Sequence, residues 1–118
     1  KVQSICTAYG AVAEVHYRCI TPAVLNDPDL TDLLESAAVS QIGRNKVLHL
    51  DKPSMGAEDF AELLEGVKGV MFRLGVAGAN GCAPLHSGYF NPDESSLKCG
   101  IEVLTSTLLA WMARRSNV

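Results

Sequence analysis

The 118-residue sequence has no long apolar run, no closely spaced cysteine pair and no excess of positive charge. Its apolar runs are shorter than the roughly 18 residues of a membrane-spanning helix, and no apolar segment follows the first residues as in a secretory signal. Ten basic against 13 acidic residues give a formal charge of −3, which argues against a general nucleic-acid binder. We therefore expect a globular cytoplasmic chain that binds neither nucleic acid nor membrane.

The chain contains four cysteines, and no two of them have the Cys-x-x-Cys spacing of zinc ribbons and thioredoxin-like redox proteins. Apolar residues make up 47 % of the chain, so a chain of this size can form a core without disulfides. We therefore expect free and mostly buried thiols in a reducing compartment. They are Cys6, Cys19, Cys82 and Cys99.

The first half of the chain contains two predicted helices. Residues 1–9 have helical composition and end at Gly10, a residue common just past a helix C-terminus. The second helix begins at Asp27, whose carboxylate can cap it, with Pro28 in its first turn. It closes at Gly43, and its apolar residues recur at three- and four-residue steps, which predicts one buried stripe.

The second half contains two more predicted helices. A turn at 53–59 leads into a helix whose apolar stripe runs to Val67. The last helix begins at Asn91 and Glu94, which have capping-box spacing, and Gly100 within it predicts close packing against a neighbouring element. Five apolar residues at helical spacing predict its buried face: Leu97, Ile101, Leu104, Leu108 and Met112.

Three segments between the helices have strand patterns. Residues 11–18 alternate between apolar and polar, which predicts a half-exposed strand, and 47–50 form a short apolar segment. Residues 70–76 are almost continuously apolar, which is typical of a strand covered on both faces. Strands alternating with helices predict an α/β domain over 26–118, preceded by the end of an α+β unit over 1–25.

His86 is the strongest candidate for chemistry, because it follows a glycine-rich loop that itself follows the strand at 70–76. Ligands bind at the carboxyl ends of strands in open α/β sheets, and an imidazole there can ligate a divalent metal or transfer a proton. The alternative is an imidazole that only hydrogen-bonds a loop carbonyl. Cys82 could share a soft metal with His86 or act as a nucleophile, or it could be an ordinary thiol.

The turn before the third helix offers weaker signals. Gly56 allows close approach to the backbone amides, and a helix N-terminus can receive a carboxylate or carbonyl oxygen of a substrate. Glu58 could bind a cationic group or support a metal ligand, although the helix dipole alone favours an acidic residue there. His16 shares the polar side of its predicted strand with two charged residues, so we expect a solvated surface histidine.

Four motifs occur in order along the chain: Met-Gly-x-Glu-Asp-Phe at 55–60, Phe-x-Leu-Gly at 72–75, Leu-His-x-x-x-Phe at 85–90 and Asp-Glu-x-x-Leu-x-x-Gly at 93–100. The series resembles the C-terminal part of the metal-dependent amidohydrolases related to aminoacylase, hippurate hydrolase and the indole-acetyl-amino-acid hydrolases. The stretch from Pro22 to Leu30 resembles the segment in which that family's chain passes from the lid domain into the catalytic domain. The resemblance covers almost the whole chain.

The resemblance implies the C-terminal half of a zinc-peptidase-like α/β domain, a mixed sheet with flanking helices, preceded by the last helix and strand of an α+β lid or dimerisation domain. It also implies two divalent metal ions, zinc or manganese, and attack of a metal-activated water on the amide bond of an N-acyl amino acid or a peptide-like amide. His86 matches the family's last metal ligand. Gly56, Glu58 and Asn26 match positions on the substrate side of the cleft.

The sequence also departs from this family. Ser87 and Gly88 stand where the family commonly has Asn and Pro after the histidine. The Cys-Gly-His-x-x-His-type motif, the Glu-Glu pair and the general-base glutamate are absent from these 118 residues, so we expect no catalytic residue here and an inactive isolated chain. The alternative is a non-enzymatic α/β module that binds a partner or self-associates. Apolar surface left uncovered by a missing half would favour a homo-oligomer.

Overall fold

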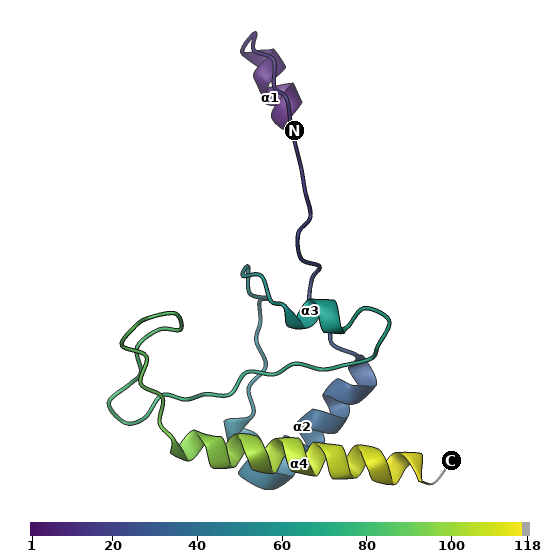
Figure 1. The fold of residues 1–118 in the computed structure, drawn as a ribbon, viewed down its shortest axis with the longest axis vertical. Helices are drawn as coiled ribbons and strands as arrows, with labels where there is room; N and C mark the ends of the chain where they lie inside the picture. The colour runs from purple at the N-terminus through teal and green to yellow at the C-terminus, as the bar shows by residue number, and fades with distance from the viewer. Residues whose placement is uncertain (117–118) are drawn as a thin grey trace.

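The computed structural model describes residues 1–116, which contain helices and irregular segments (Figure 1). Its elements are α1 (Val2–Ala8), α2 (Pro28–Ile42), the 3₁₀ turn η1 (Arg44–Lys46), α3 (Phe60–Leu63) and α4 (Ser95–Arg115). Helices α2 and α4 pack together, whereas α1 lies away from them at the end of a long irregular segment (Figure 1). The radius of gyration is 20.2 Å, against about 13 Å for a compact 100-residue domain. The described chain is therefore extended, with a small packed part.

Helix α2 begins and ends as predicted. The Asp27 carboxylate accepts a hydrogen bond from the Leu30 N–H at 3.0 Å, and Pro28 is the first residue of the helix. Gly43 follows the last residue with a φ of +85°, and its N–H donates to the Val39 carbonyl at 3.0 Å. The bounds of this helix could be predicted from the sequence, because the cap, the proline and the final glycine each act on the backbone next to them.

Helix α4 begins at Ser95, and the predicted capping box is wrong. The Asp93 carboxylate accepts a hydrogen bond from the Ser95 N–H at 2.9 Å, whereas Glu94 makes no side-chain cap. The Asn91 carboxamide instead accepts a hydrogen bond from the Ala83 N–H at 3.2 Å. The spacing was right for a cap, but the asparagine is occupied by a contact with the preceding loop.

The core lies between α2 and α4. Its buried residues are Leu34, Ala38 and Val103, with Ile42, Val47, Val70, Phe72 and Cys99 partly buried around them. Gly100 lies on the same face of α4, where a Cβ would come within 3.0 Å of the Leu74 Cδ2. The predicted close packing at this glycine is confirmed.

The predicted buried face of α4 is wrong. Its five side chains are between 52 % and 65 % exposed: Leu97, Ile101, Leu104, Leu108 and Met112. Helix α2 packs instead against Val103 through Leu34 and Ala38, and Gly100 faces Leu74 of the segment between the helices. Periodicity identifies an apolar face, but it does not identify which face the neighbouring helix covers.

No β-strand forms in the described part of the chain, so the strands predicted at 11–18, 47–50 and 70–76 are wrong for this structure and the mixed sheet is not confirmed. A strand requires a neighbouring backbone to pair with its N–H and C=O groups. Among residues 1–116 the backbone pairs in this way at one isolated bridge, between Gly78 and Gly81. The division into 1–25 and 26–118 stays a prediction.

The third helix is shorter than predicted. Helix α3 is a single turn, and of its residues only Ala61 is buried. Two residues of the predicted stripe are in solvent, since Leu63 is 70 % and Val67 65 % exposed, and the other two, Phe60 and Leu64, are half-buried. One turn of helix has few hydrogen bonds to offset the cost of nucleation, and no large apolar contact lengthens it here.

Candidate functional site

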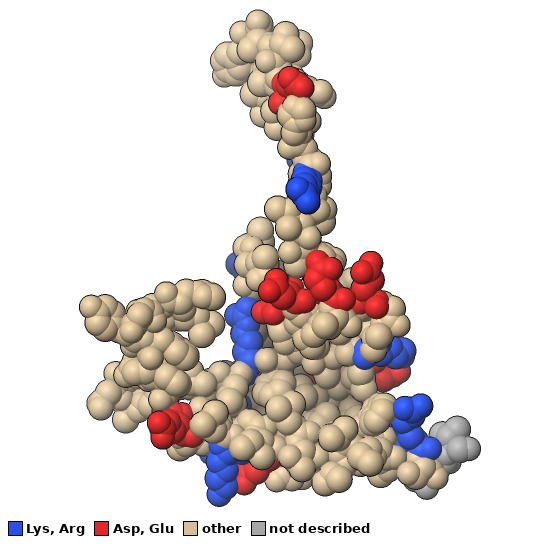
Figure 2. All heavy atoms as spheres, in the orientation of Figure 1, with Lys and Arg blue, Asp and Glu red and all other residues tan. Residues whose placement is uncertain are grey.

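The segment 77–92 forms a loop that leaves the packed part of the molecule and returns at the start of α4 (Figure 1). It contains no Lys, Arg, Asp or Glu, and Figure 2 shows an uncharged lobe at this place. At its base the Asp93 N–H donates to the Val76 carbonyl at 2.8 Å. The Asp93 carboxylate lies against Gly78, where a Cβ would come within 3.3 Å of Oδ2. The two ends of the loop are therefore held at one point.

His86 lies in a tight turn of this loop. The Ser87 N–H donates to the Pro84 carbonyl at 3.2 Å, and His86 has a φ of +67°. No other non-glycine residue among 1–116 has a positive φ. This left-handed backbone costs free energy for an L-residue, although histidine adopts it more often than most. Strain of this kind clusters at functional sites, which adds structural support to the candidate chosen from sequence.

The His86 imidazole is available to a ligand. The residue is exposed, and within the described residues no hydrogen bond or ion pair engages its ring. The alternative interpretation, an imidazole bonded to a loop carbonyl, is therefore not what the structure shows. A neutral imidazole with a free ring nitrogen is a common ligand for zinc and related metals.

Cys82 does not bond to His86. The Cys82 Sγ donates to the Ala83 carbonyl at 3.3 Å. A nucleophilic thiol needs a base within hydrogen-bond reach, so the thiol-enzyme hypothesis gains no support. The four cysteines are free as predicted, but the prediction that they are mostly buried is wrong. Cys19 is exposed, and the half-buried ones are Cys6, Cys82 and Cys99.

Gly56 and Glu58 both lie on an exposed turn before α3. The Gly56 N–H donates to the Ser54 Oγ at 3.3 Å, and the Glu58 carboxylate accepts from the Phe60 N–H at 3.1 Å. Glu58 thus holds the start of α3, as the helix-dipole interpretation expects. Its second carboxylate oxygen has no partner among the described residues and can receive a cationic group.

Acidic side chains gather around α3, as Figure 2 shows. The exposed members are Glu58, Asp59, Glu62 and Glu65. Their summed charge disfavours an anion at the start of α3, and a one-turn helix has little dipole to compensate. This surface therefore weighs against the predicted reception of a substrate carboxylate beside Gly56.

Asn26 makes two hydrogen bonds through its carboxamide, both to the backbone of Met71. The Nδ2 donates to the Met71 carbonyl at 2.8 Å, and the Met71 N–H donates to Oδ1 at 2.9 Å. The next residue continues the pairing, since the Asp27 N–H donates to the Gly69 carbonyl at 2.9 Å. The side chain replaces a strand partner for Met71, so both of its polar ends are occupied.

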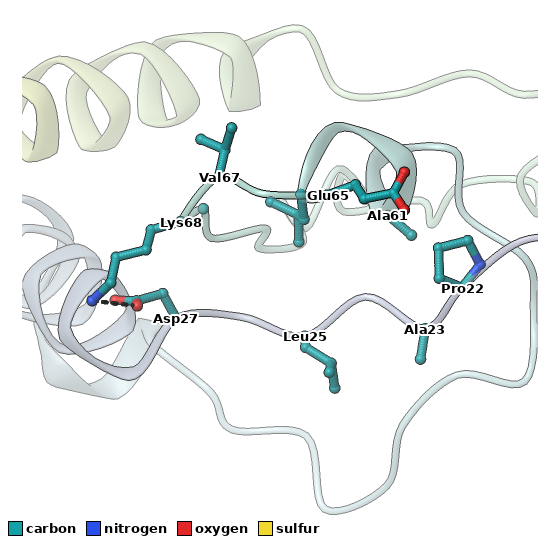
Figure 3. Close-up of a pocket in the computed structure, with 10 residues that line it drawn as sticks. Pro22, Ala23, Leu25, Asp27, Ala61, Glu65, Val67 and Lys68 are labelled. Atoms are coloured by element: carbon teal, nitrogen blue, oxygen red, sulfur yellow. Dashed lines mark ion pairs between the residues drawn. The ribbon is translucent and has the colours of Figure 1, made fainter.

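Lys68 forms an ion pair that the sequence did not reveal. Its Nζ lies 3.0 Å from the Asp27 carboxylate and 3.6 Å from that of Asp29. Figure 3 shows Lys68 reaching Asp27 at one end of a cavity of about 330 Å³. The Lys68 ammonium, followed by the Leu30 N–H, holds the pKa of the Asp27 carboxyl below its usual value. No local signal predicts this pair, because its members are distant in sequence.

A second polar cluster joins α2 to the segment after it. Glu35 pairs with Arg44, and its other carboxylate oxygen lies 3.1 Å from the His49 Nε2. Arg44 and then His49 hold the pKa of the Glu35 carboxyl below its usual value. His16, by contrast, is 84 % exposed and pairs only with Glu14 at 2.9 Å, so it is the surface histidine that we predicted.

The described residues contain no group of three or more His, Cys, Asp or Glu side chains placed to hold a metal ion. The three histidines lie in different parts of the chain, and His86 is the one histidine of its loop. A catalytic zinc has three protein ligands, so His86 can supply one donor to a metal but not a complete centre. Within residues 1–116 no helix is both long and apolar enough to cross a membrane.

Comparison with known proteins relates the chain to a family of peptidases. Residues 5–110 match the model of the peptidase family M20/M25/M40. Over 93 % of its length the chain is 41 % identical to a Synechocystis protein named "Probable hydrolase sll0100", and over 92 % it is 36 % identical to thermostable carboxypeptidase 2 of Saccharolobus solfataricus. Over 97 % it is 33 % identical to N-acetyldiaminopimelate deacetylase of Pediococcus pentosaceus. No solved structure matches the chain.

The chain covers 28 %, 27 % and 30 % of the lengths of these three relatives. Each relative therefore has more than three times as many residues as this chain aligns with.

Proposed function

The chain belongs to the peptidase family M20/M25/M40, and from this premise we propose that it supplies one metal ligand and part of the substrate cleft of a metal-dependent amide hydrolase. The observation that carries the proposal is His86. Its imidazole is exposed, free of partners among the described residues, and held on a left-handed backbone within a closed loop. A surface histidine without a role has no need of that backbone.

The metal ligand set is the first part of the proposal. Zinc and manganese both accept imidazole nitrogen, and the loop that carries His86 contains no charged side chain of its own that would compete for the ion or repel it. When bound, a pair of such ions would polarise the amide carbonyl and lower the pKa of the attacking water. His86 would hold one ion through a ring nitrogen, and the other donors and the base would come from residues outside this chain.

The substrate class is the second part. Two of the similar proteins are named a deacetylase and a carboxypeptidase, and both names describe cleavage of a bond between an acyl carbon and nitrogen. We propose an N-acyl amino acid or a related peptide-like amide as the substrate. Gly56 and Glu58 would line the substrate side, with Glu58 facing a cationic group rather than a carboxylate. Asn26 would act by holding Met71 in place, because its carboxamide is already engaged.

The isolated 118-residue chain is inactive under this proposal. Its described residues contain no group of three or more metal-binding side chains, and the loop that carries His86 has no Asp or Glu to act as a general base. Amide hydrolysis by the isolated chain with added zinc or manganese should not exceed that of buffer with the metal.

The proposal is tested by replacing His86 with Ala in the intact protein that contains this chain. Loss of a metal's supporting residue already costs about 10- to 100-fold in metal affinity or activity, so loss of the ligand should lower turnover of N-acyl amino acids by more than about 100-fold. Bound metal, measured by mass spectrometry, should fall by one equivalent. His16→Ala is the matched control, since it removes an exposed histidine on α1's side of the molecule. Full turnover and metal content in His86→Ala would refute the proposal.

A second candidate function is a non-enzymatic module that binds a partner or self-associates. The observation in its favour is the exposed apolar face of α4, whose members are Leu97, Ile101, Leu104, Leu108 and Met112. Contiguous apolar surface of this kind drives association. Intact protein that hydrolyses no amide with either metal, yet forms stable oligomers that Leu104→Asp disrupts, would favour this second candidate.

A further inference from the structure

We propose that Asn91 is a positioning residue for His86. Its side chain joins the two legs of the loop close to the turn that carries the imidazole, and so sets where a ring nitrogen meets the metal. The inference rests on the proposed function, because it concerns the same metal ligand. It adds a residue that neither the motifs nor the predicted capping box assigned to the site.

Near the turn of the loop, one hydrogen bond joins the two legs. The base is closed by the bond from the Asp93 N–H to the Val76 carbonyl at 2.8 Å. Beyond it, the bond that crosses from one leg to the other within the described residues joins the Ala83 N–H to the Asn91 Oδ1 at 3.2 Å. The Gly78–Gly81 bridge lies within one leg. Without the Asn91 carboxamide, the legs are joined only at the base.

The anchored residue controls the direction of the turn. Ala83 precedes Pro84, and a residue before proline is confined to extended backbone, while the proline ring fixes its own φ. The turn from Pro84 to Ser87 then places His86 at a φ of +67°. Holding the Ala83 N–H therefore fixes the start of a stiff segment that ends at the imidazole.

The return leg supports the same point. The Phe90 N–H donates to the Ser87 carbonyl at 3.1 Å, and the Tyr89 N–H donates to the Ser87 Oγ at 3.1 Å. These bonds connect His86's neighbour directly to the residue before Asn91. His86 is thus bounded on one side by Ala83 and on the other by Ser87, and the Asn91 side chain closes the ring between them.

No residue from 77 to 92 is fully buried, so the loop has little apolar packing to replace the lost bond. A ligand displaced by about 1 Å can lose about 100-fold in rate, and loss of a supporting hydrogen bond typically lowers metal affinity by about 10- to 100-fold. We expect the Asn91 bond to matter for metal affinity while contributing little to the stability of the α2–α4 core.

The experiment compares variants of the intact protein loaded with Co²⁺, whose visible spectrum reports coordination geometry, and measures metal affinity by competition with a chelator. Asn91→Leu has a similar volume but lacks the acceptor oxygen. It should lower the metal affinity about tenfold or more and change the Co²⁺ spectrum. Asn91→Asp keeps an acceptor oxygen for Ala83 and should restore both. Asn80→Ala is the matched control, because the Asn80 side chain lies in the same loop and makes no hydrogen bond among the described residues, so this variant should match wild type.

The outcomes separate this inference from the proposed function. If Asn91→Leu binds metal as wild type while His86→Ala does not, the positioning role is wrong and the metal ligand stands. If His86→Ala also binds metal normally, the proposed function itself fails. If Asn91→Leu does not fold, Asn91→Ser is used in its place, since it removes the reach to Ala83 with a smaller change of volume. The inference would also be overturned if Asn91→Asp lost as much metal affinity as Asn91→Leu.

Discussion

The α2–α4 pair and the 77–92 loop are held together by different forces. The pair has a buried apolar core around Leu34, Ala38 and Val103, whereas the loop has no buried residue and is shaped by hydrogen bonds and one left-handed backbone. The stable part of the chain therefore carries none of the proposed chemistry. The part that carries His86 depends on a few specific bonds, so substitutions in the two regions should have separable effects.

The largest expected effect on stability is in the core. Leu34→Ala in the intact protein should lower the free energy of unfolding by about 2–5 kcal/mol, because it leaves a cavity between the helices. Urea titration measures the change, and Ser40→Ala on the exposed side of α2 should change it by less than about 0.5 kcal/mol. Metal content per folded molecule should stay at the wild-type value in Leu34→Ala. A loss of metal from that variant while it is still folded would break the separation of the two regions.

The next effect concerns the contact between the residue before the α2 cap, Asn26, and the backbone of Met71. Asn26→Ala removes both hydrogen bonds to the Met71 backbone and should lower the free energy of unfolding by about 1–2 kcal/mol. Asn26→Asp keeps the acceptor and should lose roughly half as much. Thermal melts of the three proteins decide this. If Asn26→Ala has wild-type stability and a raised KM for substrate, Asn26 binds substrate, as the sequence predicted, and does not act through Met71.

A smaller effect should distinguish glycine from alanine at position 86. Both variants remove the imidazole, but the φ of +67° suits glycine. His86→Gly should therefore be about 1 kcal/mol more stable than His86→Ala. Equal stabilities would show that the left-handed backbone is not retained in the intact protein, and would remove the strain argument for His86.

The smallest effect is the pH dependence of the α2 cap. The pKa of the Asp27 carboxyl is held below its ordinary value of 3.8, chiefly by Lys68. Because the pKa of Asp27 is lower in the folded protein than in the unfolded one, the ion pair stabilises the fold at any pH above the pKa of the unfolded state. This stabilisation is lost as the pH falls through the pKa of the folded state. Asp27→Asn still caps the helix but should flatten the fall in melting temperature between about pH 5 and about pH 2. An unchanged acid profile would show that the pair contributes nothing.

Local features of the fold could be predicted from the sequence, and contacts between distant segments could not. Asp27, Pro28 and Gly43 act on their own backbone, so the bounds of α2 were legible. The five apolar residues of α4 could also be recognised as one face, but the sequence did not show which face α2 covers, and α2 packs against Val103. Strand patterns at 11–18 and 70–76 need a partner backbone to become strands, and pattern alone does not supply one.

The candidate site divides in the same way. His86 could be chosen from sequence because it follows a glycine-rich loop and matches a motif series. The residues that hold the His86 loop in place could not be predicted from sequence. The spacing of Asn91 suggested a helix cap, but its carboxamide accepts a hydrogen bond from Ala83 within the loop. The pairing of Lys68 with Asp27 was equally hidden. Residue types indicate the chemistry that a site can perform, but the hydrogen bonds and ion pairs that position these residues depend on which distant segments come together in the fold.

The central claim, that His86 ligates a metal, is tested most directly by anomalous diffraction from crystals of the intact protein at a zinc or manganese absorption edge. The account predicts a metal peak at a bonding distance of about 2.0–2.1 Å from a ring nitrogen of His86, as for zinc–histidine bonds. A fully occupied metal centre in the same protein with the His86 ring outside its coordination shell would contradict the account.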